Sequence, residues 1–176
     1  MPRIPYKPED LAEPADIVSA IRERRGGHLH ELDRMLLHSP PFALGWNAHL
    51  GAVRNRLKVN GRLRELAICA IAMLNQAPYE WKQHAPLFLK EGGSQAQLDA
   101  LQDIARAADH AVFDATERAV LRLTREMTRN VQVSDATFAA ARSALGDDQQ
   151  VAEMVGIIAT YNMVSRYLVA LGVDKE

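Results

Sequence analysis

The chain of 176 residues contains a single cysteine, Cys69. One cysteine excludes an intramolecular disulfide and a CxxC redox pair. Lys and Arg number 21 against 22 Asp and Glu, so the formal net charge is -1 and no basic field is present for nucleic acid. No apolar run reaches the roughly 18 uninterrupted residues that a membrane-spanning helix needs. We therefore expect a protein that binds neither nucleic acid nor membrane.

Alternating β-branched runs are also missing, whereas apolar residues recur at helical spacing along nearly the whole chain. The length suits one domain with a substantial core. Residues 1–13 hold prolines at positions 2, 5 and 8 and no apolar signal-peptide segment, which predicts an extended N-terminal arm and a cytoplasmic location. Residues 14–176 are predicted to form a single all-α domain.

The spacing of apolar residues and breakers predicts nine helices. They are expected at 14–25, 28–37, 41–57 and 61–74, from Pro78 to Gly92, at 97–107, after Asp114, at 138–145 and at 148–171. Ser94, Asp114 and Ser134 are the expected N-caps. The helices at 61–74 and 148–171 are apolar on most sides, and one domain of this size has little room to bury both. Subunit contacts would bury the surplus, so we expect a homo-oligomer.

Glu65, Glu80 and His84 are the candidate catalytic residues. Glu80 and His84 are four residues apart, so on a helix they share a face where their side chains can meet. A carboxylate and an imidazole held together are the minimal set for proton transfer near neutral pH. Glu65 begins an otherwise apolar helix, where partial burial would suit it to acid or base chemistry. The same spacing also fits an ordinary ion pair on a helix surface, and both interpretations stay open on spacing alone.

Three further residues are candidate substrate-binding groups: Trp81, Tyr161 and Arg166. Tyr161 and Arg166 are polar groups among the apolar residues of the last helix, and Arg166 would suit a carboxylate-bearing ligand. Alternatively, Arg166 pairs with an acid at a subunit contact.

A metal site is not predicted. Glu80 and His84 offer two ligands at i,i+4 spacing, but no HExxH motif and no second paired motif supplies the others. The remaining histidines considered as ligands are His28, His30, His38 and His49. Cys69 lies inside the apolar helix, where a thiol is usually inert packing.

Four blocks of sequence stand out together. They are Gly61-Arg62-Leu63-Arg64-Glu65-Leu66, Tyr79-Glu80-Trp81-x-x-His84-Ala85-Pro86, Lys90-Glu91-Gly92-Gly93-Ser94 and, in the tail, Tyr161-Asn162-Met163-Val164-Ser165-Arg166-Tyr167-Leu168. These blocks resemble the carboxymuconolactone decarboxylase / alkylhydroperoxidase D-like family, and the likeness extends from about His28 onward. It implies an all-α, single-domain helical bundle of the alkylhydroperoxidase D-like type. It also implies homo-oligomers, trimers or hexamers built from them.

In the peroxidase branch of that family, a Glu is followed by Cys-x-x-Cys-x-x-x-His, and the two thiols reduce hydroperoxides. Glu65 and His84 match the outer members of this pattern. Ala77 and Glu80 occupy the two cysteine positions. Dithiol peroxidase chemistry is therefore not available to this chain.

The decarboxylase branch also lacks the cysteine pair and has an acid four residues before its histidine, as Glu80 and His84 do here. The resemblance favours a cofactor-free lyase over a peroxidase, acting by acid/base chemistry on a small carboxylate or lactone. His84 would be the general acid/base, oriented by Glu80, with Glu65 as a relay. One alternative is a non-catalytic oligomeric scaffold or small-molecule binder. Another is residual peroxidase activity through Cys69 alone, which the missing CxxC disfavours.

Overall fold

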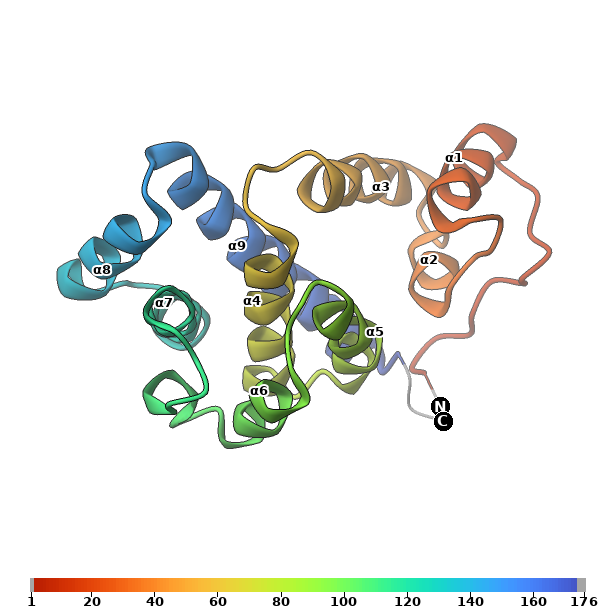
Figure 1. The fold of residues 1–176 in the computed structure, drawn as a ribbon. Coiled ribbons are helices and arrows are strands. Elements are labelled where there is room, and N and C mark those ends of the chain that lie inside the picture. The colour runs from red at the N-terminus through yellow and green to blue at the C-terminus, as the bar shows by residue number, and fades with distance from the viewer. Residues whose placement is uncertain (1, 174–176) are drawn as a thin grey trace. The chain divides into compact units, whose positions relative to one another are not determined.

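The structure is a computed structural model that describes residues 2–173 (Figure 1). Within this range the chain forms helices and turns and no strand, which confirms the predicted all-α class. The α-helices are α1 (Ala15–Arg25), α2 (Glu31–Leu36), α3 (Pro40–Asn55), α4 (Gly61–Leu74), α5 (Pro78–Lys90), α6 (Gln95–Ala100), α7 (Ala115–Asn130), α8 (Asp135–Leu145) and α9 (Asp148–Leu171). Two short 3-10 helices, η1 (Leu101–Asp103) and η2 (Ala107–Asp109), follow α6.

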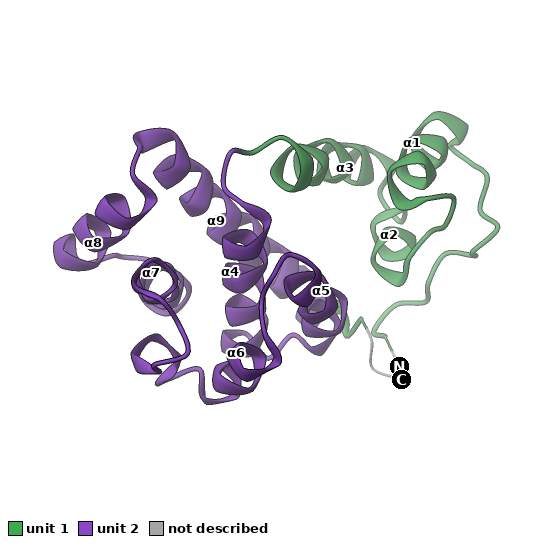
Figure 2. Ribbon diagram, viewed as in Figure 1, with its two compact units in different colours: residues 1–57, 170–176 green, residues 58–169 purple. Residues whose placement is uncertain are grey.

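The chain divides into two compact units (Figure 2). Unit 1 consists of residues 1–57 and 170–176, and unit 2 of residues 58–169. In unit 1, Ile17, Val18 and Ile21 form the buried stripe of α1 that the sequence predicts. The carboxylate of Asp33 in α2 is buried beside the guanidinium of Arg25, 3.0 Å away, so it is paired within the unit.

Helix α4 is the centre of unit 2. Every residue from Leu66 to Ala72 is buried, because the sequence is apolar on all sides of the helix. Neighbouring helices α5 and α7 both pack against α4. The side chain of Asn60 accepts a hydrogen bond from the backbone N–H of Leu63 and so caps the helix at its N-terminus.

Helix boundaries follow the local signals at most positions. Ser94, Asp114 and Ser134 each accept a hydrogen bond from the backbone N–H three residues later, which confirms all three predicted caps. Pro78 occupies the first turn of α5, where its missing N–H costs nothing. Gly92 follows the last turn in the left-handed conformation, with φ of 92°.

The helix predicted at 97–107 differs from the structure. An α-helix ends at Ala100, and the next residues form 3-10 turns, with Arg106 N–H donating to Asp103 and Asp109 N–H donating to Arg106. These turns bring Leu101, Ala107 and Ala108 into one buried apolar cluster. Packing of these side chains therefore overrides the local preference for a continuous helix.

Helix α9 is long and apolar enough to cross a membrane by length and composition alone. Half of its most apolar window is buried inside the protein, and the core helix of a soluble protein passes the same test. The helix contributes Met154, Ile157, Ile158 and Tyr161 to the buried interior. Its apolar character is therefore accounted for in part by packing.

Gly93 provides a test of packing in unit 2. A Cβ at this position would lie 2.3 Å from the ring of Phe88, which is fully buried and cannot move aside cheaply. We expect Gly93→Ala to lower the free energy of unfolding by about 1–3 kcal/mol. Gly156→Ala in α9 is the matched control, because nothing lies within 4 Å of the added methyl. That control should raise stability by about 0.5–1 kcal/mol through helix propensity. Urea unfolding of both variants checks the opposite signs, and equal shifts would contradict the packing argument.

Candidate functional site

Glu65 and His84 meet in the interior of unit 2. Nδ1 of His84 on α5 lies 2.6 Å from Oε2 of Glu65 on α4, and both side chains are buried. The guanidinium of Arg64 donates to the other carboxylate oxygen of Glu65 at 3.2 Å. The carboxylate thus lies between a permanent cation and the imidazole. An anionic carboxylate has no hydrogen to give, so Nδ1 carries the hydrogen of this bond.

The ring of Tyr161 packs against the imidazole of His84. The two rings are edge to face, with centroids 5.0 Å apart and an interplanar angle of 86°. Tyr161 itself is 1% exposed and comes from α9, so three helices contribute to the site. With Nδ1 bonded to Glu65, Nε2 is the ring nitrogen that can exchange a proton with a substrate.

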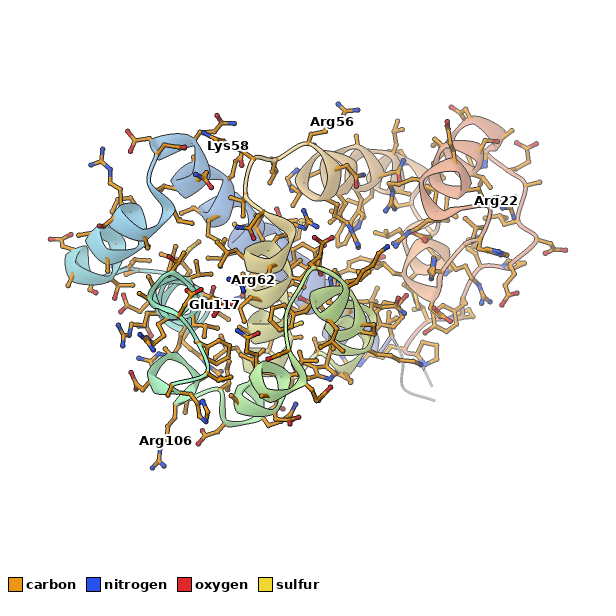
Figure 3. All side chains as sticks on the ribbon, viewed as in Figure 1. Arg22, Arg56, Lys58, Arg62, Arg106 and Glu117 are labelled. Carbon is orange, nitrogen blue, oxygen red and sulfur yellow. The ribbon has the colours of Figure 1, made fainter. Side chains whose placement is uncertain are left out.

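Glu80 is buried to 1% exposure, yet neither of its carboxyl oxygens has a hydrogen bond of good geometry in the described part of the chain. The other buried carboxylates among residues 2–173 are all partnered. Glu117, labelled beside Arg62 in Figure 3, accepts from Gln97 at 2.9 and 3.0 Å and from the backbone N–H of Asp114 at 2.9 Å. A carboxylate without partners is costly to bury, so Glu80 requires its own explanation.

Burial raises the pKa of the Glu80 carboxyl well above its ordinary value, and the Ser165 hydroxyl lowers it by less. Desolvation penalises only the charged form, so burial favours the neutral acid at Glu80. Glu65, rather than Glu80, is the hydrogen-bond partner of His84. Helical spacing places Glu80 and His84 on one face of α5, but the partner of the imidazole comes from α4.

Of the three candidate binding residues, Tyr161 lies against His84. Arg166 and Trp81 have other surroundings. Arg166 is exposed and donates to the backbone oxygen of Asn162 at 2.9 Å and to its Oδ1 at 2.8 Å. Trp81 is half-buried and lies on the wall of a pocket of about 330 Å³. The other lining residues carry no charge: Ala72, Met73, Gln76, Ala77, Pro78 and Gln102. Glu65, Glu80 and His84 do not line it.

Sequence reasoning missed the polar groups that support the cluster. Arg64 precedes Glu65 in the first of the four sequence blocks, and Asn162 and Ser165 lie in the tail block. The position of Arg64 next to Glu65 in the sequence was the signal that could have indicated this contact. No pattern in the sequence indicates that Asn75 in the α4–α5 turn contacts Ser165.

Cys69 is fully buried. Burial raises the pKa of its thiol strongly, and the carboxylate of Glu65 raises it further. The thiolate, which is the reactive form, is therefore disfavoured. No group of three or more His, Cys, Asp or Glu side chains suited to a metal occurs among the residues that the structure describes.

Residues 40–126 match the family model described as the carboxymuconolactone decarboxylase family. The chain belongs to this family. No curated protein matches its sequence significantly. The alkylhydroperoxidase AhpD core of an uncharacterized peroxidase-related protein from Ralstonia eutropha JMP134 is similar, with a TM-score of 0.81 and 20% identity. The likeness covers 99% of this chain and 92% of that one.

Two further solved structures share the fold of this carboxymuconolactone decarboxylase family member. An uncharacterized peroxidase-related protein from Silicibacter sp. TM1040 has a TM-score of 0.77 and 18% identity over 96% of this chain and 92% of its own. The debrominase Bmp8, as a cysteine-to-alanine variant in complex with 2,3,4-tribromopyrrole, has a TM-score of 0.77 and 13% identity over 98% of this chain and 92% of its own. At these identities the likeness establishes the AhpD core fold and no activity.

Glu80 makes the stability of the protein depend on pH in a predictable direction. Its pKa in the folded state is raised above the ordinary value of 4.5. The wild type therefore loses stability relative to Glu80→Gln as the pH rises from that value through the folded pKa. The stability difference between the two proteins should change by up to about 1.4 kcal/mol per pH unit in favour of the variant.

Urea unfolding of wild type and Glu80→Gln between pH 5 and pH 8 measures this difference. Glu126→Gln is the control, because hydrogen bonds from Thr137 and Ser134 lower the pKa of that partly exposed carboxyl. Its stability contribution is fully present above the ordinary pKa and is lost only as the pH falls below it, so the stability difference for the control should stay constant between pH 5 and pH 8. A stability difference for Glu80→Gln that does not vary with pH would show that Glu80 titrates normally.

Proposed function

We propose that this protein is a cofactor-free enzyme that uses acid/base chemistry on a small carboxylate or lactone. The observation that supports the proposal is the buried Glu65–His84 hydrogen bond of 2.6 Å, with a second buried carboxyl, that of Glu80, on the same helix as the imidazole. Perturbed titratable groups held together in an interior are typical of catalytic sites. Membership of the carboxymuconolactone decarboxylase family is consistent with a lyase.

His84 is the general acid/base in this proposal. When a carboxylate substrate loses carbon dioxide, the electron pair of the broken C–C bond stays on the substrate carbon, which then takes up one proton. Nε2 of a protonated His84 supplies this proton. Glu65 orients the ring through Nδ1 and stabilises the imidazolium before the transfer, while Arg64 holds the carboxylate in place.

A neutral Glu80 limits the charge around the imidazole. Two ionised carboxylates beside His84 would favour the imidazolium so strongly that it would become a poor proton donor. With Glu80 uncharged, only Glu65 acts on the ring as an anion. The substitution of a carboxylic acid for a cysteine thus leaves the Glu65–His84 pair able to work near neutral pH.

The debrominase Bmp8 shows that this fold accommodates a small ring compound in another protein. This supports the proposal of a small organic substrate for the present chain. We further propose a cytoplasmic homo-oligomer, a trimer or hexamer, since unit 2 exposes several large apolar side chains that subunit contacts would cover. These are Leu89, Phe138, Met163 and Val169.

Removal of the imidazole tests the catalytic proposal. Once a screen of small carboxylates and lactones gives turnover, His84→Asn should lower kcat by about 10²–10⁴-fold, because the proton donor is lost. Glu65→Gln should lower it less, since the ring stays in place. His28→Asn changes an exposed histidine and serves as the matched control. Full activity of His84→Asn on every substrate found would exclude this acid/base role.

A small-molecule binder without catalysis is the second candidate, and the pocket beside Trp81 favours it. A volume of about 330 Å³ lies at the lower end of the range for ligand sites. Because its lining carries no charge, the pocket suits an uncharged ring compound better than an anion of the same shape.

Benzamide and benzoate form a matched pair of probes for this pocket, being alike in shape and different in charge. We expect benzamide to bind about tenfold more tightly than benzoate. Heteronuclear NMR of the two tryptophan indoles reports the binding, with Trp81 shifting and Trp46 as the internal control. Gln102→Trp should fill the pocket and remove the shift, while Gln132→Trp outside it should not. Equal binding of the two probes would argue against an uncharged ligand.

A further inference from the structure

The outward face of α9 in unit 2 carries no charge over about four turns of helix. The exposed positions of this helix between Asp148 and Arg166 are Gln149, Ala152, Gly156, Ala159 and Met163. They recur at spacings of three and four residues, so they form one stripe along the helix, which we call the α9 stripe. The solvent face of a helix typically carries charged and polar side chains. The α9 stripe therefore has the composition of a surface that another molecule covers.

A groove of about 360 Å³ between α8 and α9 adjoins the α9 stripe. The two helices follow each other in the chain with a short turn between them (Figure 1). Four lining residues of the groove are apolar: Phe138, Val151, Ala152 and Val155. Phe138 is 42% exposed, so the groove is open to solvent. Because Ala152 belongs to both the groove and the α9 stripe, the two form one continuous apolar surface.

The α9 stripe is complementary to itself when two copies pair with their helices antiparallel. Its central positions 152, 156, 159 and 163 are spaced by four, three and four residues, so the pattern is the same in both directions. With a two-fold axis between Gly156 and Ala159, Ala159 faces the partner's Gly156 and Met163 faces Ala152 of the partner subunit. Two small residues at the centre let the helix axes approach to about 8 Å.

Met163 is the side chain that would enter the groove. It is 38% exposed, and the space that it faces in the antiparallel pair is the part of the groove lined by Ala152. Methionine is unbranched and flexible, so it adapts to an irregular apolar gap. An isologous contact is made twice, once from each copy, which doubles the apolar surface that each insertion buries.

Opposite charges stand at the two ends of the α9 stripe, with Asp148 before it and Arg166 after it. Nη1 of Arg166 donates to Asn162, whereas no hydrogen bond of its Nε or Nη2 occurs within residues 2–173. The side chain of Asp148 is 79% exposed, so a further donor can reach it. The antiparallel pair brings Arg166 near Asp148 of the partner subunit at both ends. A parallel pair would bring the two guanidinium groups together, and like charges in contact are unfavourable.

We propose that the α9 stripe and the α8–α9 groove form a two-fold, antiparallel interface with a second copy of this chain. The inference rests on the proposed homo-oligomer and names its contact. An isologous contact requires a two-fold axis, which a hexamer of two paired trimers contains and a simple trimer lacks. Of the two proposed assemblies, the hexamer is therefore the one that this interface fits. Arg166 pairs with an acid at a subunit contact in this arrangement.

Mixtures of single-residue cysteine variants test the register of the pair. Ala152→Cys mixed with Met163→Cys should be joined by a short bifunctional thiol crosslinker, because the two positions face each other across the axis. Neither variant alone should link to itself, since the two copies of either position lie about 16 Å apart along the helix axis. Cys69 is fully buried, so wild type serves as the control and should give no link.

A charge at the centre of the interface tests its contribution to assembly. Ala159→Glu places two carboxylates against each other, and the dissociation constant of the contact should rise at least about 100-fold. Ala140→Glu makes the same change at an exposed position of α8 outside the groove and should leave assembly unchanged. Sedimentation velocity over a range of concentrations measures both variants against wild type.

Links of each cysteine variant to itself would show a parallel pair and overturn the proposal. No link in the mixture would show that another molecule covers the α9 stripe, with the same consequence. A simple trimer in sedimentation would reject this interface and retain the proposed homo-oligomer, whereas a mass of 19.5 kDa at every concentration would reject both. The acid/base proposal stays separate from these results, because activity of His84→Asn decides it.

Discussion

The burial of α4 on all sides is the constraint on which the site depends. A helix that is apolar all round packs against neighbours over its whole length, and α5 and α7 supply them. Glu65 is the charged residue among the buried residues of this helix, so its carboxylate needs partners inside the protein. It finds Arg64 on its own helix and His84 on α5, and the latter bond fixes the tautomer and orientation of the imidazole. One buried carboxylate thereby determines that Nδ1 of His84 carries the hydrogen of this bond.

Buried carboxylates in this protein fall into two kinds that differ in what surrounds them. Glu117 and Asp33 are saturated with donors and act as structural anchors for the starts of α7 and α2. Glu80 is equally buried and lacks donors. Burial alone therefore does not distinguish these two kinds of carboxyl group; the supply of hydrogen-bond donors does.

Much of this arrangement is predictable from the sequence, for local reasons. Caps at Ser94, Asp114 and Ser134, the buried α4 and the choice of Glu65, Glu80 and His84 all follow from spacing, propensity and resemblance. The partner of His84 does not, because helical periodicity describes which residues share a face and says nothing of the side chains that an adjacent helix brings. Ser165 and Asn75 are 90 residues apart in the chain, and only packing of α9 unites them. The local sequence pattern also predicts the wrong structure after α6, where it indicates a continuous helix. Burial of Leu101 and Ala107 in the core favours the 3-10 turns that form there.

The absence of the family's cysteine pair gains a physical meaning from these contacts. Glu80 occupies the second cysteine position of the peroxidase pattern, where a thiol would carry a removable proton next to the imidazole. A carboxyl whose pKa is raised by burial can hold a proton at the same place, although it cannot transfer electrons as a thiol pair does. Cys69, one turn along α4 from Glu65, does not restore the redox chemistry, since its thiol is buried and the carboxylate of Glu65 opposes its ionisation. The exchange of thiol for carboxylic acid therefore removes the thiol pair that electron transfer needs and leaves a group that can hold a proton.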